Sequence, residues 1–181
     1  MKRSGARIIG AVYLLYFLAV IFASFLVGRV PLAYSDAANL IANAVYVAVT
    51  LLLYEILKPV SRSVALIAVV ISIAGCIVQS LSLFHLVSPQ SALPIFGLFN
   101  LTIGYLILRS TFLPRALGVL MALSGLAWLL VLSPELLKLT KMYIEITGVL
   151  AEGLLMLWLL VFGVNVKRWN EQAGGAARWR S

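Results

Sequence analysis

Two glutamates lie within the last long apolar segment of the chain. This segment, residues 142–164, has Glu145 near one end and Glu152 close to its middle. It is long enough to cross a bilayer as a helix, and a carboxylate at mid-depth is costly unless it is paired, protonated or hydrated. The two carboxylates are about two helical turns apart, so they face the same way. Glu152 could therefore bind a proton or a cation, provided that other segments complete the site.

The other long segments of the chain are also apolar. Of 181 residues, 63% are hydrophobic and 11% are charged, whereas about a quarter of the residues of a soluble domain are charged. The sequence predicts an all-α fold, a polytopic membrane bundle of six transmembrane helices, in a single domain over residues 1–166. Residues 167–181 are expected to form a basic, partly disordered cytoplasmic tail. The expected helices are residues 8–27, 37–57, 63–86, 92–108, 115–132 and 142–164.

Local signals mark the ends of these segments. Residues 28–36 are expected to form a loop in which Pro31 acts as a helix breaker. Ser35 or Asp36 is expected to cap the second helix. Ser133 followed by Pro134 and an acid resembles a helix start, which predicts a short interfacial turn over residues 135–141 before the sixth helix. The first apolar run could instead be a signal peptide. It is longer than a usual signal sequence, however, and no small-x-small cleavage site follows it.

Lys and Arg are distributed unevenly between the two sides of the expected bundle. With an even number of spans, both termini share one side with the second and fourth loops. That side holds eleven of the 14 basic residues, and the other side holds Arg29, Lys138 and Lys141. Both termini are therefore expected in the cytoplasm, where the basic residues would meet anionic lipid head groups of the bilayer. No nucleic-acid-binding motif accompanies the net charge of +8, so no nucleic-acid partner is expected.

Polar side chains recur in the outer half of several segments. In the second segment they are spaced i, i+4, i+7 and i+11, which is one stripe of a helix. The third segment adds an amide and a histidine, and the fourth adds an asparagine near mid-depth. Lipid cannot satisfy such groups, so they should face inward. The sequence predicts an outward-facing polar pocket floored by Glu152, between the second, third, fourth and sixth helices. Its candidate residues are Glu152, Glu145, Asn100, Gln79, His85, Asn43, Asn39 and Tyr46.

Most of these candidates have a simpler structural interpretation. Asn and Gln often join helix pairs in membranes, which would account for Asn39, Asn43 and Gln79. His85, near a helix end, could be solvated at the interface, and Glu145 could be hydrated near the head groups. Glu152 differs from these, because a buried acid is costly where an amide would join helices more cheaply.

The surroundings of Glu152 can also be anticipated in part. No Lys or Arg falls at its depth in any segment, so a neutral, hydrogen-bonded acid or a hydrated one is expected. Tyr13 and Tyr16 of the first segment could reach the pocket, although aromatic packing is the simpler interpretation of both.

The sequence lacks the familiar catalytic and cofactor motifs. It has no GxSxG, no HExxH and no P-loop, and its single histidine argues against a haem held by two histidines of one chain. No metal and no cofactor are expected. The favoured hypotheses are a small proton- or cation-coupled transporter, or a subunit of one, and a membrane scaffold that binds a lipid or a partner helix. A membrane enzyme acting on a lipid or apolar substrate is less favoured.

Four stretches together carry a family resemblance. They are RIIGAVYL at residues 7–14, LKPVSRS at 57–63, GYLILRSTFLPRALGVL at 104–120, and EGL at 152–154 with LWLLV at 157–161. From about residue 7 to residue 165 the chain resembles the bacterial integral-membrane family catalogued as domain of unknown function 4386. The resemblance implies a small multi-helix protein of the bacterial cytoplasmic (inner) membrane. It implies no reaction, substrate or catalytic residue, so the candidate site rests on the residues alone.

Overall fold

Long helices make up almost the whole protein. The computed structural model describes residues 3–178, with the side chains of residues 3, 4, 134, 136–141, 145 and 176–178 left aside. No strand occurs in that range, so the all-α prediction is confirmed. The long helices are α1 (Arg3–Leu26), α2 (Leu32–Leu57), α3 (Arg62–Leu83), α4 (Leu93–Arg109), α5 (Arg115–Leu129) and α6 (Pro134–Val161). Short 3-10 turns at Pro89–Ala92 and Leu130–Leu132 precede α4 and follow α5, and α7 (Val166–Arg178) ends the described chain.

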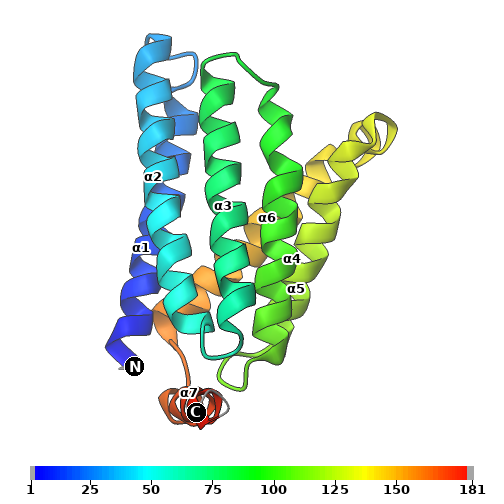
Figure 1. Cartoon of the computed structure of the whole chain (residues 1–181). Helices are drawn as coiled ribbons and strands as arrows, with labels where there is room; N and C mark the ends of the chain where they lie inside the picture. The colour runs from blue at the N-terminus through cyan, green and yellow to red at the C-terminus, as the bar shows by residue number, and fades with distance from the viewer. Residues whose placement is uncertain (1–2, 179–181) are drawn as a thin grey trace.

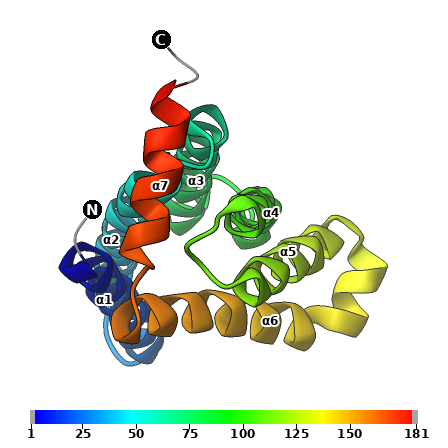
Figure 2. The same cartoon turned by 90° about the horizontal axis from the view of Figure 1, so that it is seen from below.

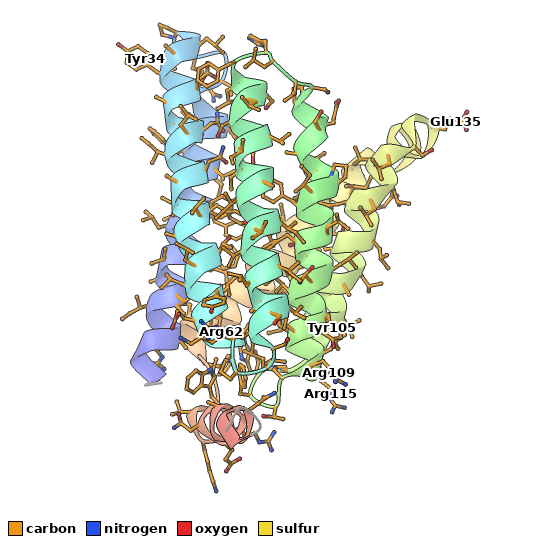
Figure 3. The ribbon with its side chains drawn as sticks, in the orientation of Figure 1. Tyr34, Arg62, Tyr105, Arg109, Arg115 and Glu135 are labelled. Atoms are coloured by element: carbon orange, nitrogen blue, oxygen red, sulfur yellow. The ribbon has the colours of Figure 1, made fainter. Side chains whose placement is uncertain are left out.

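Six of these helices, within residues 3–178, are long and apolar enough to cross a membrane. Their outward-facing sides expose large aliphatic and aromatic side chains, as at Ile8, Leu18, Ile67 and Leu150. Figure 3 shows such side chains projecting from the bundle along its length. A soluble protein rarely exposes apolar surface of this extent. The chain is thus a multi-pass membrane protein, as its composition predicts.

The six helices form a closed ring in chain order. Each helix packs against the next one in sequence, and α6 packs against α1 to close the ring. Figure 2 shows this order from one end of the bundle. Helix α6 runs obliquely behind the others in Figure 1, from the end of α5 to the base of α1. With 28 residues, α6 is about 42 Å long against a hydrocarbon core of about 30 Å, so the oblique course accommodates its length.

Glycines bring the backbones of α4 and α5 close together. Gly97 faces Gly125, and Gly104 faces Gly118; the second pair lies seven residues later in α4 and seven residues earlier in α5. A Cβ added at Gly104 would lie 2.8 Å from the backbone oxygen of Gly118 and 2.8 Å from the backbone nitrogen of Ala122. Small residues at such crossings are typical of membrane helix pairs, because they allow close van der Waals packing. This contact holds α4 and α5 as a rigid pair.

Three predicted helix starts differ from the structure, and the first is that of α1, which begins at Arg3 rather than near residue 8. Helix α2 begins at Leu32 rather than near residue 37, directly after Pro31, whose φ of −51° already suits a helix entrance. The hydroxyl of Ser35 consequently lies inside the first turn, where it donates to the backbone oxygen of Leu32 at 2.8 Å rather than capping the helix. Helix α6 begins at Pro134 and continues without a break, because residues 135–147 contain no Gly or Pro to end the expected interfacial turn.

The chain beyond residue 165 forms a helix where the sequence predicts a partly disordered tail. Helix α7 lies beneath the bundle (Figures 1 and 2). The Trp169 indole donates to the backbone oxygen of Ile56 at 2.9 Å, and Gln172 Oε1 accepts from the backbone nitrogen of Thr111 at 3.0 Å. Asn165 Oδ1 caps the helix start. These anchors precede the Gly174-Gly175 pair that suggests disorder, so they order most of the segment.

The two ends of the bundle differ in charge. Arg62, Arg109 and Arg115 project at the end where α7 lies, whereas Tyr34 and Glu135 mark the opposite end (Figure 3). Both ends of the described chain lie at the basic end (Figure 1). This arrangement is the one that an even number of spans requires.

Candidate functional site

The carboxylate of Glu152 lies inside the ring of helices. Glu152 as a whole residue is 6% exposed to solvent. The Tyr13 hydroxyl on α1 donates to Oε2 at 2.8 Å, and the Asn100 amide on α4 donates to Oε1 at 3.3 Å. The Tyr46 hydroxyl on α2 lies 3.4 Å from both carboxylate oxygens. Side chains of α1, α2 and α4 therefore converge on one acid of α6.

Asn100 extends this network to a fifth helix. Its Nδ2 also donates to the Ser124 hydroxyl on α5 at 3.3 Å. Its Oδ1 is buried and has no hydrogen-bond partner among the described residues. A buried amide oxygen without a partner is unusual, because it forfeits the hydrogen bond that it would make with water. Asn100 thus has an unused acceptor beside Glu152.

The four residues of this cluster lie at one depth. Tyr13 is ten residues into α1, and Asn100 and Glu152 each precede the last residue of their helices by nine. Tyr46 precedes the end of α2 by eleven. All of these distances are counted from the basic end of the bundle. At 1.5 Å per residue this places the cluster roughly 15 Å from that end, near the middle of a bilayer.

No cationic side chain pairs with Glu152 among the described residues. The ion pair found there joins Lys58 and Glu55, at 2.6 Å and at the basic end of the bundle. Within the same range, no group of three or more His, Cys, Asp or Glu could hold a metal ion. The donors to this carboxylate within the described residues are hydroxyls and an amide.

A cavity of about 90 Å³ runs from Glu152 toward the turn at Pro89–Ala92. That turn joins α3 to α4 at the end of the bundle opposite to α7 (Figure 1). The cavity connects the buried carboxylate with the non-basic end. Its lining residues are Tyr16, Tyr46, Gln79, Pro89, Ala92, Leu93, Phe96, Trp128 and Glu152.

Comparison with known proteins assigns the chain to a family. The model described as "Domain of unknown function (DUF4386)" matches residues 33–94 and 90–163. The chain belongs to the DUF4386 family. No curated protein and no solved structure matches it significantly. The family resemblance expected from the sequence is confirmed, and the matched residues of this DUF4386 chain include Tyr46, Asn100 and Glu152.

Three of the predicted pocket residues lie together in this DUF4386 protein, and a fourth lies near them. Tyr46 and Asn100 contact Glu152, and Gln79 lines the cavity above it. Gly148, one turn from Glu152, provides room for the Trp128 indole, whose Nε1 donates to the backbone oxygen of Ile144 at 3.1 Å.

The remaining predicted residues lie elsewhere. Asn43 donates to the Ser80 hydroxyl at 3.1 Å, and Asn39 donates to the backbone oxygen of Ser35 in its own helix at 2.9 Å. These bonds agree with the helix-joining interpretation of Asn43. His85 is exposed just beyond the end of α3 with a φ of 58°, so it lies outside the cavity. The side chain of Glu145 is outside the described residues.

Two residues of the cluster were not predicted as site residues. From the sequence, Tyr13 and Tyr16 could both reach the pocket, but aromatic packing is the simpler interpretation of each. Ser124 is a common small residue in an apolar helix and gives no signal by itself. A comparison of depths along the predicted helices could have identified Tyr13 and Ser124, since each lies about as far from the basic end as Glu152 does.

Proposed function

We propose that this membrane protein binds a proton or a small cation at Glu152, as a small transporter or as a subunit of one. The observation that carries the proposal is a buried carboxylate without a cationic partner, at the inner end of a cavity. Buried acids inside membrane helices are costly and commonly mark ion or proton pathways.

The hydrogen-bond network around Glu152 is suited to both protonation states. An ionised carboxylate accepts from Tyr13, Tyr46 and Asn100, as the distances show. A protonated carboxyl must also donate, and the Tyr46 hydroxyl oxygen, 3.4 Å from both carboxyl oxygens, can act as its acceptor. Neither state then leaves a buried donor of Glu152 without a partner. Such a network supports reversible proton or cation binding.

We also propose that the basic end is cytoplasmic, in the cytoplasmic membrane of a bacterium. The uneven distribution of Lys and Arg supports this orientation. Single cysteines at Tyr34 and at Arg62, in a Cys76→Ala background, test it. A membrane-impermeant thiol reagent added to intact cells should label the first position and should label the second only after permeabilisation. The reverse pattern would refute the orientation.

Proton conduction tests the role of Glu152 directly. The protein is reconstituted into liposomes that contain a pH-sensitive dye, and a membrane potential is imposed. The wild type should acidify or alkalinise the lumen according to the sign of the potential, and Glu152→Gln should abolish this flux. Glu135→Gln, an exposed acid at the far end of α6, is the matched control and should conduct as the wild type does. Equal flux through both variants would refute the proposal.

The same cluster supports a second candidate, a scaffold whose centre is held by hydrogen bonds. Glu152 and Asn100 together join α1, α2, α4, α5 and α6, which is a structural role in itself. A scaffold predicts that liposomes with wild-type protein conduct no more than empty ones. It also predicts that changes on the lipid-facing sides of the helices impair function more than Glu152→Gln does.

A further inference from the structure

We propose that the cavity above Glu152 binds a small methylated ammonium cation, held by the carboxylate and by a wall of aromatic rings. This deepens the proposed cation-binding role of Glu152 and rests on it. The chemical class follows from three features of the cavity: its aromatic lining, the partial occupation of its carboxylate by protein donors, and its size.

The aromatic rings form one continuous wall. Tyr16 and Tyr46 have ring centroids 4.6 Å apart, Tyr46 and Phe96 are 5.5 Å apart, and Phe96 and Trp128 are 6.3 Å apart. All four residues line the cavity, and they come from α1, α2, α4 and α5. The faces of aromatic rings attract cations, most strongly for Trp and most effectively away from water. Quaternary ammonium ions are the ligands for which such aromatic cages are best suited.

The carboxylate supplies charge rather than free hydrogen-bonding capacity. Ionised, it offers about four acceptor positions. Tyr13 and Asn100 each occupy one, and the Tyr46 hydroxyl lies within 3.4 Å of both oxygens. A primary ammonium would need acceptors for three N–H groups and would find few of them here. A fully methylated nitrogen has no N–H to satisfy, so it obtains the charge attraction without that penalty.

Small inorganic cations fit the cavity less well. Hard cations such as Mg²⁺ and Ca²⁺ require about six or more oxygen ligands. Among the side chains of the lining, the oxygen atoms that could act as ligands belong to the Glu152 carboxylate, two tyrosine hydroxyls and the Gln79 amide. No Lys or Arg is among the lining residues, so an organic cation meets no competing charge within the described part of the chain.

The size of the cavity limits the ligand to a few carbon atoms. A single water needs roughly 10–15 Å³ of such space, so about 90 Å³ corresponds to roughly six or more waters. A tetramethylammonium ion is of this order, whereas a long-chain or polycyclic cation would have to displace Phe96 or Trp128.

Equilibrium dialysis of the full-length protein in nanodiscs with radiolabelled tetramethylammonium tests the proposal. Saturable binding is expected that is displaced by excess unlabelled ion but not by K⁺, methylammonium or the neutral isostere tert-butanol at equal concentration. Trp128→Leu should weaken binding roughly 3- to 30-fold, the loss of one cation–π contact. Trp158→Leu is the matched control, because that indole stacks on Phe162 outside the cavity, and it should bind as the wild type does.

Two results would overturn the proposal: displacement by tert-butanol or K⁺ as effective as by unlabelled tetramethylammonium, or equal weakening by Trp128→Leu and Trp158→Leu. Proton flux in liposomes distinguishes failure of the proposed ligand class from failure of the proposed function. Flux that depends on Glu152 without tetramethylammonium binding refutes the ligand class alone. Specific tetramethylammonium binding supports the ligand class even in a protein that conducts no protons.

Phe96→Leu gives a second measure if Trp128→Leu does not fold. This change leaves every hydrogen bond to Glu152 in place, and it should also weaken tetramethylammonium binding.

Discussion

Tyr13 and Tyr46 both approach Glu152, but the structure predicts that they contribute unequally. The Tyr13 hydroxyl lies 2.8 Å from Oε2, within the usual O–H···O range of about 2.5–3.0 Å. The Tyr46 hydroxyl lies 3.4 Å from each oxygen, outside that range. Removing the Tyr13 hydroxyl should therefore cost more of the interaction with Glu152 than removing the Tyr46 hydroxyl does.

The magnitude depends on the charge of Glu152. A hydrogen bond to an ionised group contributes about 1.5–3 kcal/mol, whereas neutral side-chain bonds between membrane helices average about 0.6 kcal/mol. The coupling free energy between Tyr13 and Glu152 should therefore be about 2 kcal/mol if the acid is ionised and about 0.6 kcal/mol if it is neutral. The coupling free energy between Tyr46 and Glu152 should stay below about 0.5 kcal/mol in either state. The Tyr46 hydroxyl is far from both carboxylate oxygens and shares its proton between them.

Double-mutant cycles measure these couplings. Tyr13→Phe and Tyr46→Phe are each combined with Glu152→Leu, and the free energy of unfolding is followed by circular dichroism in mixed micelles with increasing SDS. Tyr105→Phe is the control, because this tyrosine is 48% exposed on α4 and should show no coupling. A coupling of Tyr46 that equals or exceeds that of Tyr13 would refute the geometric reasoning.

Two further predictions concern the parts that hold the bundle together. Gly104→Val should destabilise the protein by about 1–3 kcal/mol, because its side chain would push against the α5 backbone, whereas Gly174→Ala, with open space around it, should change stability by less than about 0.5 kcal/mol in the same SDS titration. Trp169→Phe should loosen α7 by removing its bond to the end of α2, seen as faster amide hydrogen exchange over residues 167–175 with exchange in α4 unchanged; equal exchange in wild type and variant would contradict this anchoring.

The sequence predicts the helices well because each is a long apolar run between short polar turns. At two of the helix starts that differ from the prediction, a proline begins the helix earlier than expected. Pro31 starts α2 immediately, and Pro134 starts a helix that nothing interrupts before its membrane-spanning part. These differences move the boundary of a helix but leave the number of spans unchanged.

The candidate site was partly predictable for a different reason. Glu152 is recognisable because a carboxylate inside the membrane costs free energy, and the polar stripe on α2 identifies Tyr46 by helical periodicity. Periodicity on one helix does not reveal which neighbour it faces, so the ring closure of α6 on α1, and with it Tyr13, could not be derived. His85 shows the converse error, because the predicted third helix ran to residue 86, whereas α3 ends at Leu83 and leaves His85 beyond the helix.

The ring order has a consequence for how the protein is assembled. Helices α1, α2 and α4, which carry the donors to Glu152, are synthesised and inserted before α6. A charged residue at the centre of an isolated helix opposes insertion by about 3 kcal/mol. The earlier helices present Tyr13, Tyr46 and Asn100 as ready partners for that carboxylate. The acid at the centre of the mature protein thus enters the membrane after its three partners, and its insertion completes both the ring and the cavity.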